Sequence, residues 1–140
     1  MTKKLTKQDI NKMYVRNLFG FQWGWNYEKM QGLGYAYSIM PVLKRLYSDD
    51  KEKMSIALKT HLGFFNTTPA MSSLIVGADA GLEEEFGMAD PEAITGLKTG
   101  LMGPFAGVGD TVFIAIYRAI VFSIAAYMAQ AGQVLGLLIP

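Results

Sequence analysis

Residues 100–132 read GLMGPFAGVGDTVFIAIYRAIVFSIAAYMAQAG, a glycine-rich run followed at once by an apolar stretch of helix length. Between residues 111 and 131 the only charged side chain is Arg118, and roughly 20 mostly apolar residues are what a bilayer core requires. A large soluble protein can bury such a helix on all sides, but a chain of 140 residues is too small to do so. The stretch therefore predicts a membrane protein with at least one transmembrane helix.

The glycine-rich run is expected to break the helical backbone ahead of that helix. Glycine lets the backbone leave helical geometry, and transporters use such breaks to aim helix ends at substrates. A tight loop between two membrane helices would show the same pattern. An Arg inside a span normally faces a partner or an aqueous path, with a structural ion pair to another subunit as the plainer alternative. The structural or gating candidates are Gly103, Pro104, Gly107, Gly109 and Arg118.

Composition excludes several classes of function. The net charge is +1, which gives no reason to expect a nucleic-acid partner. The chain has no Cys and one His, so disulfides, thiol catalysis and cysteine metal sites are excluded and a zinc site is not expected. Nucleophile-elbow and phosphate-loop motifs are also missing from the sequence. We therefore expect no metal, no cofactor and no catalytic residues of the chain's own.

Positive and negative charges are unevenly distributed along the chain. Residues 1–59 hold eleven of the thirteen Lys and Arg but five of the twelve acidic residues, whereas residues 60–140 hold two basic and seven acidic ones. A basic segment ahead of a spanning helix predicts a cytoplasmic N-terminus. We expect basic cytoplasmic or interfacial helices over residues 1–63 and the membrane-embedded part over residues 64–140.

Helical patterns account for the remaining segments, so the expected fold is an all-α polytopic membrane protein. Residues 10–18 have an amphipathic pattern that suits either a basic helix on an anionic membrane surface or a helix packed on the protein. Residues 64–82 are apolar but short, with Asp79 inside them, and suit a re-entrant hairpin or a short buried helix. The acidic run at residues 83–85 is expected to be a solvated end.

Three ordered motifs resemble those of a known family. WNYEKMQGLGY, HLGFFNTTP and GLKTGLMGPFAGVGD are similar in order and spacing to the enzyme IID component of the mannose/fructose/sorbose-type sugar phosphotransferase system, also called the mannose family. LEEE at residues 82–85 and the run from Asp90 fit as well, so the resemblance covers nearly the whole chain. It also implies that the chain corresponds to about the N-terminal half of an IID subunit, as a fragment, a truncated product or one half of a split subunit would.

The resemblance implies a subunit of the bacterial cytoplasmic (inner) membrane that pairs with the IIC component as a hetero-oligomer in the lipid bilayer. The pair would move sugar inward while IIA and IIB relay phosphate received from HPr. The phosphorylated histidines of the family belong to IIA and IIB, so His61 is not expected to carry phosphate. An alternative is that the subunit mainly supports the assembly of IIC and makes no sugar contacts itself.

Neutral sugars are held by amides, carboxylates and stacked rings, because their hydroxyls both donate and accept hydrogen bonds. Seven aromatic residues lie between residues 19 and 37 with polar side chains among them; an aromatic belt at the bilayer surface is the alternative explanation. The candidate sugar-binding residues are Glu28, Gln31, Asn66, Thr67 and Asp110, with His61 as a weaker candidate.

The chain departs from the mannose-like members of the family at four positions. Those members typically read HLEFFNT and GVGDPxFWxxxRP, whereas here Gly63, Thr111, Ile114 and Ala119 replace the glutamate, a proline, the tryptophan and a second proline. These differences favour a divergent branch, such as amino-sugar or sorbose-type systems, over mannose or glucose.

Overall fold

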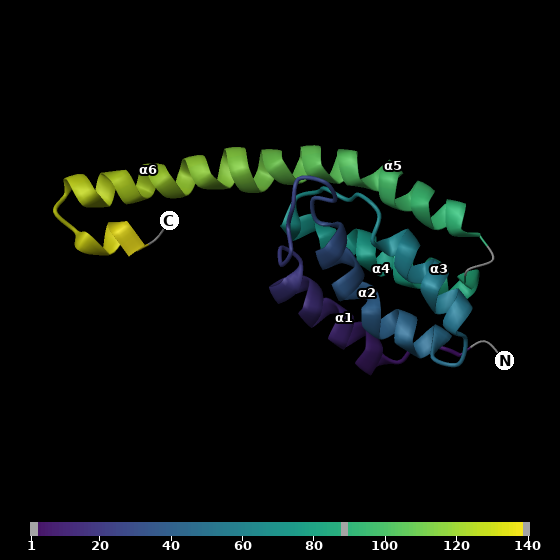
Figure 1. Cartoon of the computed structure of the whole chain (residues 1–140). Helices are drawn as coiled ribbons and strands as arrows, with labels where there is room; N and C mark the ends of the chain where they lie inside the picture. Colours follow the sequence, from purple (N-terminus) through teal and green to yellow (C-terminus); the bar gives the residue numbers. More distant parts are fainter. Residues whose placement is uncertain (1–2, 88–89, 139–140) are drawn as a thin grey trace. The chain divides into compact units, whose positions relative to one another are not determined.

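The computed structural model describes residues 3–87 and 90–138, and in these residues the chain is helical with isolated β-bridges and no strand (Figure 1). The all-α prediction is therefore confirmed. The elements follow in the order α1 (Lys7–Gly20), α2 (Gly32–Tyr47), α3 (Lys51–His61), α4 (Pro69–Glu85), α5 (Pro91–Gly109), the π-helix η2 (Asp110–Ile116), α6 (Tyr117–Gln130) and the 3₁₀-helix η3 (Val134–Leu138). The chain divides after Ala106 into two compact units.

The first unit is built around α2, which packs against α1, α3 and α4 (Figure 1). Its apolar face supplies the centre of the core, where Tyr35, Ile39, Val42 and Leu43 are completely buried. Partly buried side chains of α5 pack against the same core. The core therefore fixes α2, which follows loop 21–31, and α3, which precedes loop 62–68; these two loops carry most of the functional candidates.

Helix α1 packs on the protein through a narrow stripe. Met13, Asn17 and Gly20 are buried, whereas Tyr14 and Leu18, which share the expected apolar face, are more than half exposed. Protein packing thus accounts for one face of α1, and its contact with a membrane surface stays a prediction.

The predicted break in the glycine-rich run is wrong, because α5 continues as a helix through Gly109. A proline inside a helix removes one hydrogen bond and crowds the carbonyl four residues earlier. Here the residue four positions before Pro104 is Gly100, which has no side chain to hinder a small adjustment. The irregular backbone comes later, as the π-helix that begins at Asp110.

The second unit consists of η2, α6 and η3. Helix η3 packs back onto α6, and a Cβ at Gly136 would lie 2.7 Å from the Cβ of Met128. Within the described residues, Pro91–Gln130 is the one helical stretch long and apolar enough to cross a membrane, judged by length and composition. It contains nearly all of the segment that the sequence predicts to span.

Candidate functional site

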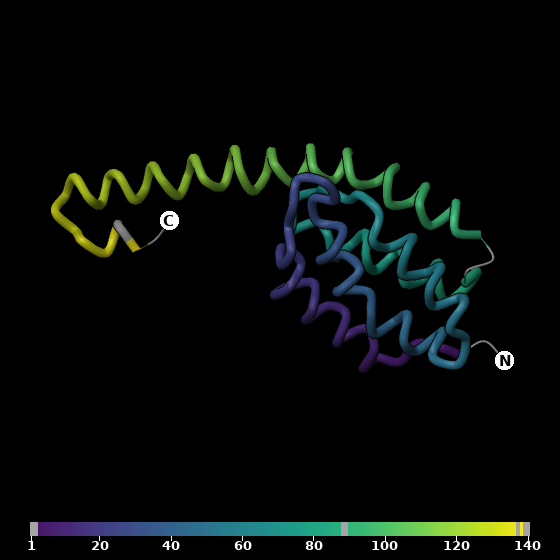
Figure 2. The backbone as a smooth tube through the Cα atoms, in the orientation of Figure 1, coloured from purple at the N-terminus to yellow at the C-terminus, as the bar shows by residue number. Residues whose placement is uncertain are grey.

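Two loops of the first unit, residues 21–31 and 62–68, run side by side and are joined by backbone hydrogen bonds (Figure 2). The amide of Gln31 donates to the carbonyl of Phe65 at 2.8 Å, and the amide of Phe65 donates to the carbonyl of Lys29 at 3.3 Å. Met30 between them has φ +50°, a left-handed conformation that is uncommon outside glycine and is found at constrained functional loops. The pairing brings two of the three motifs into one structure.

Gln31 ties the loops together with its side chain as well. Its amide Nε2 donates to the carbonyl of Thr67 at 2.8 Å, and its Oε1 accepts from the amide of Thr67 at 2.8 Å. Both residues are buried. The Thr67 hydroxyl also donates to the carbonyl of Met102 at 3.2 Å, so this end of the loop is fixed to α5 as well.

Glycines at the start of α2 allow these loops to approach closely. A Cβ at Gly34 would lie 1.7 Å from the carbonyl oxygen of Phe21, and one at Gly32 would lie 2.4 Å from that of Gly63. Neither backbone oxygen can be displaced as a flexible side chain could. The two positions therefore require glycine for the observed loop packing.

The structure brings together some of the predicted sugar-binding residues and not others. Gln31 and Thr67 are in direct contact, and Glu28 and Asn66 are exposed on the same pair of loops. His61 is buried one residue before loop 62–68. Asp110 belongs to the second unit, so its role stays a separate prediction.

The first loop also carries exposed aromatic rings. Trp23 and Tyr37 have ring centroids 6.0 Å apart, and Trp25 meets the ring of Tyr27 edge-on at 4.9 Å. Trp23 and Tyr27 are largely exposed, at 65% and 85%. Such rings beside a carboxylate and an amide form a surface on which a sugar ring can stack and hydrogen-bond.

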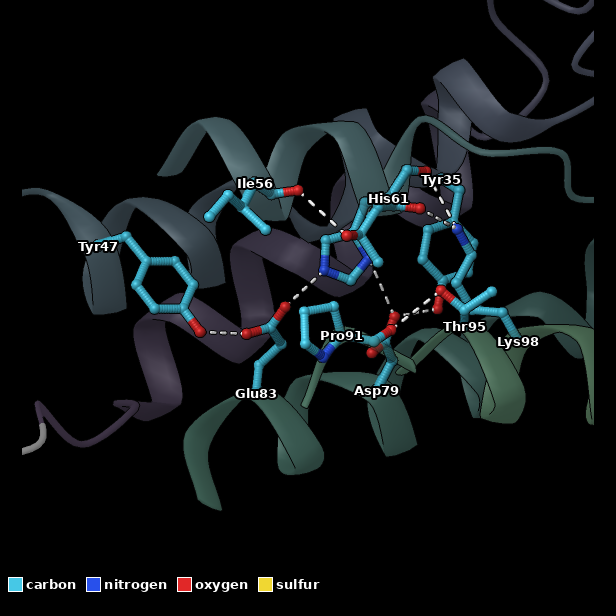
Figure 3. A network of polar contacts seen from close by, with 10 residues as sticks. Tyr35, Tyr47, Ile56, His61, Asp79, Glu83, Pro91, Thr95 and Lys98 are labelled. Carbon is cyan, nitrogen blue, oxygen red and sulfur yellow. Dashed lines mark hydrogen bonds and ion pairs between the residues drawn. The ribbon is translucent and has the colours of Figure 1, made fainter. Parts of the chain in front are cut away.

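A network of buried charged groups lies behind loop 62–68 (Figure 3). The Nε2 atom of His61 is 2.7 Å from the Oε1 atom of Glu83, and its Nδ1 atom is 3.2 Å from the Oδ2 atom of Asp79. The hydroxyl of Tyr35 donates to Asp79 and that of Tyr47 donates to Glu83. Both carboxylates project from one face of α4 at positions i and i+4, so this face holds the ring of His61 between them.

Lys98 completes the network from α5. Its ammonium group donates to the carbonyls of Thr60 and His61 at 3.1 and 3.2 Å and lies 4.5 Å from the ring centre of Tyr35. These carbonyls belong to the last residues of α3, where the helix dipole favours a cation. Lys98 is 3% exposed, so its charge is offset inside the protein instead of by water.

The pKa of His61 is raised above its ordinary value. Burial lowers this pKa, but the hydrogen bonds and negative charges of Asp79 and Glu83 outweigh burial and favour the imidazolium. With His61 and Lys98 positive and the two carboxylates negative, the buried charges balance.

The acidic run at residues 83–85 was expected to be a solvated end, and this is wrong for its first residue. Glu83 is 2% exposed. Glu84 accepts a hydrogen bond from the amide of Leu5, and Glu85 is exposed as expected. The four-residue spacing from Asp79 to Glu83 is the sequence signal that could have identified the buried pair.

Comparison with known proteins identifies the family. Residues 4–140 match the PTS system mannose/fructose/sorbose family IID component. The chain belongs to this family. The family prediction from the three motifs is thereby confirmed.

Several curated IID components resemble the chain along nearly its whole length. It is 42% identical over 137 residues to the mannose-specific EIID component of Escherichia coli K12, covering 96% of this chain and 48% of that protein. It is 39% identical to the fructose permease IID component of Bacillus subtilis and 40% identical to the sorbose-specific EIID component of Klebsiella pneumoniae. The chain thus spans about half the length of these relatives.

Solved structures share the fold. A chain in the cryo-EM structure of the mannose transporter ManYZ in complex with microcin E492 superimposes with a TM-score of 0.89 at 41% identity, covering 98% of this chain and 51% of that one. A second structure, described as a membrane protein, gives a TM-score of 0.83 at the same identity. The helical arrangement of this IID chain is therefore that of the corresponding half of a membrane transporter subunit.

Proposed function

We propose that this IID chain is part of a phosphoenolpyruvate-dependent sugar permease of the bacterial cytoplasmic membrane, with its N-terminus in the cytoplasm. Together with a IIC subunit it would form the pathway for sugar uptake, while IIA and IIB supply the phosphate that they receive through HPr. Family membership over residues 4–140 carries this proposal. The helical stretch Pro91–Gln130, long and apolar enough to cross a membrane, supports it.

The paired loops are the proposed sugar-binding surface. Glu28 and Asn66 are exposed there, and their side chains offer a carboxylate and an amide to sugar hydroxyls, while the exposed rings of Trp23 and Trp25 on the first loop can stack on a sugar ring. Gln31 and Thr67 are buried and bonded to one another, so we assign them the task of holding the loops.

The test is sugar binding by the chain co-expressed with its IIC subunit and purified in mild detergent. Mannose, fructose and sorbose serve as probes, measured by calorimetry. We expect Asn66→Ala and Glu28→Gln to weaken binding at least tenfold, because each removes a direct hydrogen-bonding group. Gln8→Ala, an exposed change on α1, is the matched control and should bind normally. Normal binding by both loop variants would refute the assignment.

A second candidate function is support of complex assembly, and the surface of α5 favours it. Gly96, Gly100 and Gly103 lie on one helical face, and among the described residues outside their own helix backbone nothing approaches within 4 Å of a Cβ placed at any of them. Small residues let a second helix approach closely in a membrane. If assembly is the main role, Gly100→Leu should abolish co-purification with IIC, whereas Gly77→Leu, at an equally open position on α4, should not.

A further inference from the structure

The network around His61 lies directly at the start of the proposed sugar loop. His61 is the last residue of α3, and loop 62–68 begins with the next residue. The far end of the same loop is held by Gln31 through both the amide and the carbonyl of Thr67. Between these two attachments Asn66 is exposed. Phe65, just before Asn66, is also anchored through its backbone to Lys29 and Gln31, so the attachment at His61 governs the segment that leads into Phe65.

The geometry at His61 calls for a charged ring. The Nε2 atom of His61 is hydrogen-bonded to Glu83 at 2.7 Å, whereas Nδ1 lies 3.2 Å from an oxygen of Asp79, an ion-pair distance without hydrogen-bond geometry. A neutral imidazole has one N–H, so one of the two carboxylates would meet a nitrogen lone pair, whereas the imidazolium places a positive charge beside both carboxylates. All three side chains are at least 98% buried, so water cannot replace the lost contact.

Lys98 fixes the same junction from its backbone side. It donates to the carbonyls of Thr60 and His61, the last turn of α3 before the loop. The ring of His61 meets Tyr35 from α2 and the carboxylates of Asp79 and Glu83 from α4, while Lys98 from α5 bonds its carbonyl. Tyr47 from α2 bonds the far side of Glu83. When Lys98 and both carboxylates are charged, protonation of His61 makes the cluster neutral.

We propose that protonated His61, held between Asp79 and Glu83, is the positioning group for loop 62–68, so that loss of its proton releases the start of the loop. This proposal rests on the assignment of that loop to sugar binding. His61 itself is buried and touches no sugar. Its effect on binding passes through the loop that begins beside it.

The direction of the pH dependence follows from the charge. The contacts favour the protonated ring, so their contribution is fully present below about pH 6.5, the ordinary pKa of histidine, and is lost as pH rises through the higher pKa of folded His61. The loop should therefore be ordered at pH 5–6 and mobile at pH 9.

The chain has no cysteine, so Phe64→Cys provides a single attachment point for a nitroxide label on the exposed surface of the loop. The labelled chain is reconstituted in liposomes, and its spectrum is recorded from pH 5 to 9. We expect label mobility to rise with a midpoint above pH 6.5. A label on Gln8→Cys in α1 controls for changes elsewhere and should not respond.

Glu83→Gln removes the negative charge from one side of the ring, and Glu85→Gln makes the same change two residues further along α4 at an exposed position. The first should lower the midpoint by about 1–3 pH units, a typical effect of a close opposite charge, and the second should leave it unchanged. Equal midpoints in the two variants would overturn the proposal. The proposal would also be overturned if the label on Phe64→Cys, with the network otherwise intact, had the same mobility at pH 5 and pH 9. This second outcome does not depend on whether Glu83→Gln folds.

Sugar binding separates this inference from the proposed function. In complex with IIC, affinity for the bound sugar should fall over the pH range in which the loop becomes mobile. Absence of binding to mannose, fructose and sorbose at every pH would count against the sugar-site assignment, whereas the label still reports on the loop. Binding that stays constant while the loop becomes mobile would refute the positioning role.

Discussion

Replacing Gln31 should separate the two paired loops. In Gln31→Met the side chain keeps its length but can no longer bond the amide and carbonyl of Thr67, both now at 2.8 Å from it. Leaving a buried polar group without a partner costs about 1–3 kcal/mol. Because the amide and the carbonyl of Thr67 would both lose their partner, the free energy of unfolding should fall by about 2–6 kcal/mol. This is a large part of the stability of a small domain.

The change can be followed by denaturant unfolding in mild detergent micelles. Both tryptophans, Trp23 and Trp25, lie in the first of the two loops, so their fluorescence reports directly on this region. Gln22→Met, at an exposed position of the same loop, is the control and should change the unfolding free energy by less than about 0.5 kcal/mol. A loss below about 1 kcal/mol for Gln31→Met would refute the reasoning.

Gln31→Glu tests the same contact by a second route. An ionised carboxylate can accept from the amide of Thr67 but would face its carbonyl oxygen without a proton to donate. The variant should therefore be destabilised at neutral pH. Protonation restores a donor, and burial raises the pKa of a carboxyl group, so stability should recover as pH falls toward 5. Equal destabilisation at both pH values would contradict this account.

Five further substitutions address other parts of the chain. Gly34→Ala would place a Cβ 1.7 Å from a backbone oxygen and should prevent normal folding. Gly77→Ala has open space around its new Cβ and should stabilise α4 by about 0.5–1 kcal/mol. Denaturant unfolding measures both effects. Tyr47→Phe removes a hydroxyl bonded to a buried carboxylate and should cost about 1–3 kcal/mol, while Tyr27→Phe, 85% exposed, should be neutral in the same assay. Arg118→Leu should favour membrane insertion of the segment by about 2.5–3.5 kcal/mol, measured as the inserted fraction in microsomes; an unchanged fraction would argue against a central position in the span.

Short motifs and helix periodicity predicted the family and the helical class because both depend on local sequence. The pairing of loops 21–31 and 62–68 could not be predicted in the same way. It depends on a contact between Gln31 and Thr67, 36 residues apart, and on close approaches at Gly32 and Gly34. The sequence marks such glycines, but it does not say which backbone comes near them.

The prediction from sequence was least accurate for the solvent exposure of charged residues. Periodicity places Asp79 and Glu83 on one face of a helix, but whether that face meets water or a buried histidine depends on how α3 packs against α4. Lys98 poses the same problem, since a single lysine in a glycine-rich helix usually remains solvated. The prediction for the glycine-rich run was wrong for a different reason: glycine permits a break but does not require one, and α5 continues as a helix through Gly109.

The loop that leads from His61 to Thr67 alternates between anchored and outward-facing positions. Phe65 and Thr67 are buried, while Phe64 and Asn66 are exposed, and Gly63 between α3 and this pair is half-buried. Substitutions at the exposed positions can therefore change the surface of the loop while the buried anchors, Phe65 and Thr67, stay the same. A library of variants at residues 64 and 66 is the natural place to test for altered sugar preference, because a change of side chain at these exposed positions leaves the anchoring residues in place.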